Sequence, residues 1–199
     1  MIVADRKPLD EILASIRSFN RVLLMGCGGC VTVCFSGGTK AVEILASQLR
    51  MAGKQAGREI ETAESTPTRQ CEPEFLDAAR KDVESAEAVL SMACGVGVQA
   101  LAERYPDKPA IPALNTKFMG YPIAHGAWEE RCAGCGDCVL EWTGGYCPIA
   151  RCAKKLLNGP CGGSQNGKCE TSTRENEIAC VWQLIHDRLK RLGRLDNLK

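Results

Sequence analysis

The stretch Arg21-Val22-Leu23-Leu24-Met25-Gly26-Cys27 decides the fold of this 199-residue chain. An uninterrupted apolar run that ends at a glycine is typical of a strand buried in a parallel sheet. The segment after it predicts an amphipathic helix, which ends at Gly53 and buries Val42, Leu45, Ala46 and Leu49 on one face. A buried strand followed by such a helix begins an alternating pattern.

The alternation of strands and helices continues along the chain. Apolar runs at 59–63, 88–92 and 110–114 predict three further strands. A helix from Pro73 is expected before the third strand, with Phe75, Leu76, Ala79 and Val83 as its apolar side chains. A short helix is expected from Gly97 to Arg104. The pattern predicts an α/β fold, in which a small doubly wound parallel sheet carries helices on both faces.

Composition and charge exclude several classes of protein. Hydrophobic residues make up 45% of the chain and its net charge is +1, so it lacks the basic surface of a nucleic-acid-binding protein. The longest apolar run, Ala88 to Val98, is much shorter than the roughly 20 residues of a membrane span. Acidic residues interrupt the start of the chain, where a signal peptide would be apolar. We therefore expect a cytoplasmic protein with no membrane or nucleic-acid partner.

Cysteine is the unusual component, with 13 in the chain. Disulfides are rare in the cytoplasm, where clustered cysteines more often bind metal. A sparse group comprises Cys27, Cys30, Cys34, Cys71 and Cys94. A dense group comprises Cys132, Cys135, Cys138, Cys147, Cys152, Cys161 and Cys169. The division predicts an α/β domain over 1–120 and, over 121–199, a cysteine-rich iron–sulfur segment with a terminal helix.

The sparse cysteines follow the expected strands. Cys27, Cys71 and Cys94 each lie beyond a strand, and ligands of open parallel sheets bind outside the carboxyl ends of the strands. The spacing Cys27-x2-Cys30-x3-Cys34 lets thiolates converge on a [4Fe–4S] cluster or on zinc. Buried, unliganded cysteine is the alternative. Backbone amides that approach the sulfurs and tune a bound cofactor are expected at Gly26, Gly28 and Gly29.

The dense group opens like a bacterial ferredoxin, with Cys132-x2-Cys135-x2-Cys138 followed by Cys147-Pro148. Glycine-rich turns and many thiols leave little local core, so metal is expected to hold this segment together. Twelve clustered cysteines would serve at least two [4Fe–4S] clusters, and zinc or a nest of redox disulfides are the alternatives. A histidine ligand at His125 is less expected than a solvent-exposed or core histidine.

The C-terminal segment predicts an amphipathic helix. Ser172 and Glu175 have the spacing of a capping box, and Gly193 follows as a stop. Docking onto its own domain is expected for the apolar stripe, which comprises Ile178, Val181, Trp182, Ile185, Leu189 and Leu192. Cys180 lies beside this stripe, where a structural role is expected.

Five longer motifs carry a resemblance to a known family: MGCGGCVTVCFSGG at 25–38, RQCE at 69–72, SMACGVGVQ at 91–99, PALNT at 112–116 and the dense segment at 132–163. The chain resembles the small subunit of the two-subunit methylenetetrahydrofolate reductase of acetogenic bacteria, and the C-terminal domain family named after that reductase. The resemblance implies an iron–sulfur protein, with which zinc is also associated. Its partner would be a catalytic subunit that carries FMN or FAD, and further electron-input subunits are compatible with it. It maps both cysteine groups to metal sites.

The expected function follows from the motifs and from the resemblance together. The sequence shows no acid–base pair, phosphate loop or flavin motif, so we expect a non-catalytic subunit of an oxidoreductase. Through [4Fe–4S] clusters it would pass electrons to the flavin of the partner, where methylenetetrahydrofolate is reduced in one-carbon metabolism and acetogenesis. A zinc-binding scaffold that only stabilises the partner is the main alternative. A subunit of the heterodisulfide-reductase type would call for adjacent cysteines, and the sequence has none.

Overall fold

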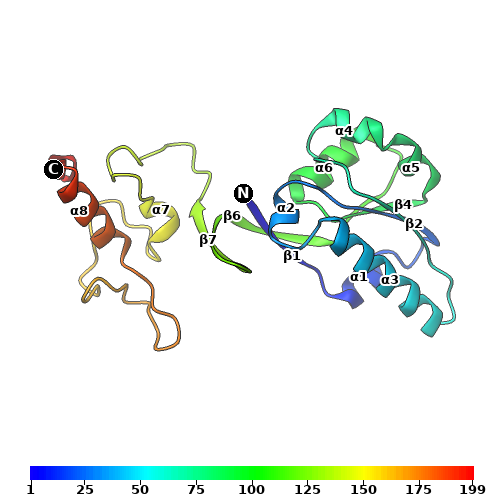
Figure 1. The fold of residues 1–199 in the computed structure, drawn as a ribbon, viewed down its shortest axis with the longest axis horizontal. Coiled ribbons are helices and arrows are strands. Elements are labelled where there is room, and N and C mark those ends of the chain that lie inside the picture. The colour runs from blue at the N-terminus through cyan, green and yellow to red at the C-terminus, as the bar shows by residue number, and fades with distance from the viewer. The chain divides into compact units, whose positions relative to one another are not determined.

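The structure is a computed structural model that describes residues 1–199. It contains two compact units, Met1–Phe118 and Met119–Lys199, each described here by itself. Figure 1 labels their helices and strands in chain order. None of the helices has both the length and the apolar character needed to cross a membrane.

The first unit is built on a parallel sheet of four strands in the order β3-β2-β4-β5. The central strands β2 (Arg21–Met25) and β4 (Ala88–Ser91) are flanked by β3 (Glu61–Ser65) and β5 (Ala110–Pro112). Leu23 of β2 pairs with Ala63 of β3 on one side and with Val89 of β4 on the other. The α/β class and the parallel sheet are confirmed.

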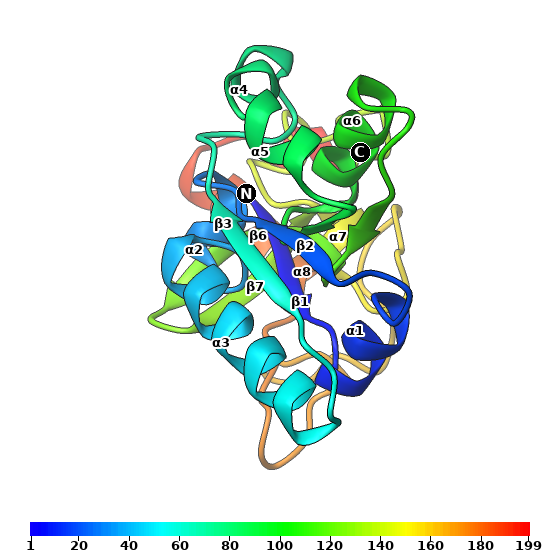
Figure 2. The same cartoon turned by 90° about the vertical axis from the view of Figure 1, so that its right-hand side faces the viewer.

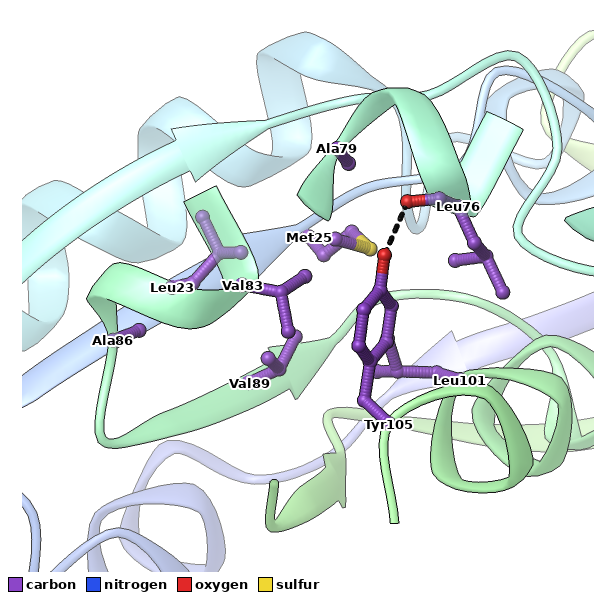
Figure 3. Packing of buried hydrophobic residues seen from close by; sticks show 9 residues of the cluster. All are labelled: Leu23, Met25, Leu76, Ala79, Val83, Ala86, Val89, Leu101 and Tyr105. Atoms are coloured by element: carbon purple, nitrogen blue, oxygen red, sulfur yellow. Dashed lines mark hydrogen bonds between the residues drawn. The ribbon is translucent and has the colours of Figure 1, made fainter. Parts of the chain in front are cut away.

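Helices cover both faces of this sheet, as Figure 2 shows. On one side lie α1 (Leu9–Ser15) and α3 (Thr39–Gln55), and α3 buries the four predicted apolar side chains. On the other side lie α4 (Pro73–Ala78), α5 (Arg80–Ser85) and α6 (Gly95–Arg104). Their core includes Leu23, Val83, Val89 and Leu101, and Tyr105 donates a hydrogen bond from its hydroxyl to the Leu76 carbonyl at 2.6 Å (Figure 3).

Several element boundaries differ from those expected. Helix α3 continues through Gly53 and ends at Gln55, with Ala56 as its C-cap residue before Gly57, whose φ is 67°. A Cβ on Gly53 would lie 2.7 Å from the carbonyl oxygen of Arg58, so this glycine admits the returning chain and does not stop the helix. The expected strand at 59–63 begins two residues later, and the helix from Pro73 is broken at Ala79 into α4 and α5.

A second sheet was not expected from the sequence. It contains three strands in the order β1-β6-β7: β1 (Ile2–Arg6), β6 (Leu114–Ala124) and β7 (Ala127–Cys132). Strands β6 and β7 form an antiparallel hairpin whose turn contains Gly126 at a φ of 76°. Most side chains of this hairpin are exposed, so the alternation of apolar and polar residues that marks a strand is weak there.

The second unit has short elements separated by long loops. Helix α7 (Pro148–Arg151) is a single turn, as is helix α2 (Cys30–Val33) of the first unit. The main helix, α8 (Val181–Arg191), buries Val181, Trp182, Ile185 and Leu189 as predicted, and Gly193 ends it with a φ of 67°. The predicted capping box is wrong. The helix begins after Cys180, and the Ser172 hydroxyl bonds the backbone N–H and carbonyl of Ile178.

Candidate metal centres

The topology of the parallel sheet brings separate cysteine-bearing loops to one edge. The chain leaves β2 for β3 on one side and later forms β4 and β5 on the other, so the strand order reverses between β2 and β4. Such a reversal opens a crevice beyond the carboxyl ends of the two strands, where ligands bind in open α/β sheets. Cys27 follows β2, and Cys94 follows β4 as the N-cap residue of α6. Cys71 lies between β3 and α4.

Electrostatic effects show that these thiols are neighbours. Partial burial raises the pKa of the Cys71 thiol, and the nearby Cys27 and Cys94 raise it further. The guanidinium of Arg69 donates a hydrogen bond to Glu72 at 2.5 Å, and this bond raises the pKa of Arg69. The nearby Cys71 and Cys30 raise the pKa of Arg69 further. Cys71 therefore lies within electrostatic range of Cys27 and Cys94, and Arg69 lies within range of both Cys71 and Cys30.

Gly26, Gly28 and Gly29 were expected to direct their backbone amides at cysteine sulfurs, but two of these amides bond backbone carbonyls. The amides of Gly26 and Gly28 donate to the carbonyls of Ser65 (2.8 Å) and Pro67 (2.9 Å). A Cβ on Gly26 would lie 2.7 Å from Thr66 Oγ1 and 2.8 Å from Val42 Cγ2, which leaves no room for a side chain. Gly29 is the one of the three whose amide donates to no backbone carbonyl, and a Cβ on it would lie 3.6 Å from the Cys27 sulfur.

Cys34 occupies different surroundings from the other sparse cysteines. Its buried thiol lies 3.2 Å from the Ser36 hydroxyl, 3.6 Å from the Ala4 carbonyl and 3.7 Å from the Val31 carbonyl. It lines a cavity of about 800 Å³ together with residues of β1 and of the first turns of α3. None of the other twelve cysteines lines this cavity. The contacts of the Cys34 thiol are thus with β1, Val31 and Ser36.

Two polar residues at the sheet edge were missed from the sequence. Gln70 and Ser91 are fully buried, and the Ser91 hydroxyl donates to Gln70 Oε1 at 2.7 Å. The Gln70 side-chain amide donates to the carbonyls of Met25 and Gly26, each at 2.7 Å. The signal that could have found them is a glutamine directly before Cys71 and a serine at the end of an otherwise apolar strand.

The dense cysteines lie on turns, loops and element ends of the second unit. Cys132 ends β7, whereas Cys147 caps α7 and its sulfur accepts a hydrogen bond from the Ala150 amide at 3.4 Å. The ammonium group of Lys154 pairs with Glu170, which raises the pKa of Lys154, and Cys161 and Cys152 add to this effect. The Cys161 thiol also donates to Glu170 at 3.7 Å. Cys152, Cys161 and this ion pair are therefore neighbours, while Cys132, Cys135 and Cys138 are exposed.

All thirteen cysteines are free thiols, and no three His, Cys, Asp or Glu side chains are arranged to hold a single metal ion. Their chemistry nevertheless fits a thiolate-bound group: soft sulfur donors stand beside Arg69 in one unit and beside Lys154 in the other. A cavity of about 860 Å³ in the second unit is lined by residues that include Trp142, Trp182 and a single thiol, that of Cys161. Cys161 also belongs to the group around Lys154, but one thiol in its lining does not make this cavity a metal site. Cys180 is buried in the core of α8, in line with the structural role expected for it.

Comparison with known proteins finds similarity to one family model. A family described as methylene-tetrahydrofolate reductase C terminal matches residues 111–199, which include the end of β5 and the whole second unit. No curated protein matches the chain. No solved structure matches it either. The cysteine-rich half of the chain is thus similar to the C-terminal region of methylenetetrahydrofolate reductases.

Proposed function

We propose that this chain is an iron–sulfur electron-transfer subunit, which passes electrons to the flavin of a partner methylenetetrahydrofolate reductase subunit. The observation that carries the proposal is the gathering of Cys27, Cys71 and Cys94 from three separate loops at the switch point of the sheet. The match of the second unit to the reductase family supports the identity of the partner system.

The sheet-edge site would use the four thiols around Cys71: Cys27, Cys30, Cys71 and Cys94. Such a set has the ligand number of a [4Fe–4S] cluster, which when bound supplies one-electron chemistry. Arg69 would offset part of the negative charge of the thiolates, and Lys154 would do so near Cys152 and Cys161. Glu72 and Glu170 hold these two cations in place through ion pairs.

A matched pair of substitutions tests this ligand set. Cys30→Ser removes a thiol beside Arg69, and Cys34→Ser removes a thiol that faces the β1 side of the unit. We expect Cys30→Ser to lose about four iron atoms per chain and Cys34→Ser to lose none, because one [4Fe–4S] cluster needs all four of its ligands. Iron and sulfide are measured after anaerobic purification. Equal loss from both variants would contradict the four-thiol set.

The electron-transfer role is tested by rapid mixing. The partner's flavin is mixed anaerobically with a low-potential donor, with and without this chain, and its absorbance is followed. We expect flavin reduction to be faster with the chain than without it, and the Cys30→Ser chain to lose this advantage. Equal rates in the presence and absence of the chain, together with zinc in place of iron, would favour the scaffold function instead.

A further inference from the structure

Gln70 occupies a fully buried position at the sheet edge, directly before Cys71. Both N–H groups of its side-chain amide are used: one bonds the Met25 carbonyl and the other the Gly26 carbonyl, at 2.7 Å each. These two carbonyls lie at the end of β2, immediately before Cys27. Gln70 thus ties the loop of Cys71 to the loop of Cys27.

Ser91 fixes the orientation of the same amide. Its hydroxyl donates to Gln70 Oε1 at 2.7 Å, which leaves the two N–H groups of Gln70 facing β2. The Ser91 oxygen accepts from the Ala93 amide at 3.4 Å, so the turn that leads to Cys94 joins the same network. The Met92 amide donates at 2.8 Å to the Met25 carbonyl, the same carbonyl that Gln70 bonds. Three cysteine loops therefore meet at one glutamine.

The space around Gln70 is shaped to receive it. A Cβ on Gly97, in the first turn of α6, would lie 3.0 Å from Gln70 Cβ and 2.7 Å from Ala93 Cβ. Only a glycine lets α6 approach this closely, and α6 begins directly after Cys94. The first turn of α6, which follows the N-cap residue Cys94, thus packs closely against the Cβ atom of residue 70.

We propose that Gln70 is the positioning residue of the sheet-edge thiol site: its hydrogen bonds to β2 and Ser91 hold the Cys27, Cys71 and Cys94 loops in register before any metal binds. The role rests on the proposed thiolate site, and Gln70 itself touches no metal. A buried amide with all its bonds made holds loops more firmly than apolar packing, because each lost bond leaves a buried polar group without a partner.

The test is site-resolved alkylation of the full chain. Metal-free protein is loaded with Co(II) and treated with iodoacetamide, and the alkylation rate of each cysteine is read by peptide mass spectrometry. In the unsubstituted chain Co(II) should protect Cys27, Cys30, Cys71 and Cys94. Gln70→Met, which keeps the length of the side chain without its hydrogen bonds, should raise the alkylation rates of these four thiols about 10- to 100-fold. Protection of the dense cysteines should stay unchanged.

Further variants separate positioning from general loss of stability. Ser91→Ala should weaken protection in the same four thiols and Ser91→Thr should restore it, because only threonine keeps the hydroxyl. Val83→Ala, which makes a cavity in an apolar core cluster of the same unit that includes neither Gln70 nor Ser91, should lower the thermal unfolding temperature without loss of protection. If Gln70→Met does not fold, the Ser91 pair decides the question.

The outcomes distinguish the two proposals. Equal protection in the unsubstituted, Gln70→Met and Ser91→Ala chains would overturn the positioning role and leave the thiol site standing. A loss of protection in Val83→Ala as large as in the Gln70 and Ser91 variants would also overturn it. No protection of the four thiols in the unsubstituted chain would overturn the thiol site and, with it, the role of Gln70.

Discussion

The two units of this chain differ in what holds them together. The first unit buries large apolar side chains on both faces of a parallel sheet, among them Leu23, Leu24, Leu45 and Leu90. In the second unit the buried apolar side chains form one cluster on α8: Cys180, Val181, Trp182, Ile185 and Leu189. The stretch from Gly134 to Gly145 in that unit contains four glycines with positive φ and no strand. The comparison teaches that the first unit has an extensive apolar core apart from its cysteines, whereas the second unit combines one small core cluster with seven further cysteines on its loops and element ends.

Metal removal should produce the largest difference between the units. Chelation of the purified chain should expose the backbone at 132–172, because a segment with little core depends on its metal for folding. The strands β2 and β4 should stay protected. Hydrogen–deuterium exchange of the metal-loaded and chelated chains, read by peptide, measures this. A segment 132–172 that keeps its protection after complete chelation would show that metal does not hold it.

Matched cysteine substitutions should sharpen the contrast. Cys30→Ser should abolish the sheet-edge site and leave the first unit folded, because the core of that unit lies beneath the sheet edge. Cys147→Ser should cost the second unit both its metal and its local fold. Exchange protection and iron content are measured together on each variant. If Cys30→Ser unfolds the first unit as fully as Cys147→Ser unfolds the second, the comparison between the units fails.

A cavity in the small core of α8 should have a smaller effect. Ile185 is fully buried there, and an isoleucine-to-alanine change in a core costs about 2–5 kcal/mol. Ile185→Ala should therefore increase exchange across α8 and its loops and leave the first unit unchanged. Leu192→Ala, at an exposed residue just after the same helix, is the control. Increased exchange in β2 or β4 would show that the units do not unfold separately.

The smallest expected effect concerns a carboxylate of the first unit. Hydrogen bonds from the backbone amides of Asn20 (2.7 Å) and Arg21 (3.2 Å) hold the pKa of Glu87 below its ordinary value of 4.5. The charged form therefore adds stability above that pH, and this stability is lost as the pH falls through the lower pKa of the folded state. Glu87→Gln should lower the thermal unfolding temperature at neutral pH and have little effect near pH 3.

Glu74→Gln is the control for this prediction, since Glu74 is an exposed carboxylate in the same unit. If Glu87→Gln lowered the thermal unfolding temperature equally at neutral and at acidic pH, the loss would come from packing and not from the charge of Glu87.

The sequence by itself determined the elements in which apolar residues form a continuous run or recur at helical spacing. The run Arg21–Met25 and the stripes of α3 and α8 predict their structure, because burial of one face depends on spacing that the sequence displays. It also predicts that Cys27, Cys71 and Cys94 lie at one sheet edge, since the carboxyl ends of parallel strands share one edge. The hairpin of β6 and β7 was not predicted, because its side chains are mostly exposed. The start of α8 was not predicted either, because Ser172 bonds Ile178 in the preceding loop and does not cap the helix.

Only the tertiary structure decided which residues complete the site. Cys34 has the right spacing for a ligand, yet the turn after α2 directs its thiol to Ala4 of β1, a partner 30 residues away in sequence. Gln70 and Ser91 lie within the motifs RQCE and SMACGVGVQ, but the motifs alone do not show that the two side chains bond each other, and their hydrogen bonds join segments up to 45 residues apart. Gly53 lies inside α3 because the chain that returns to β3 passes too close for a Cβ. Local spacing decides which side chains share a face of a helix or strand. Contacts between segments distant in the sequence form only when the strands pair and the helices pack, so only the tertiary structure shows them.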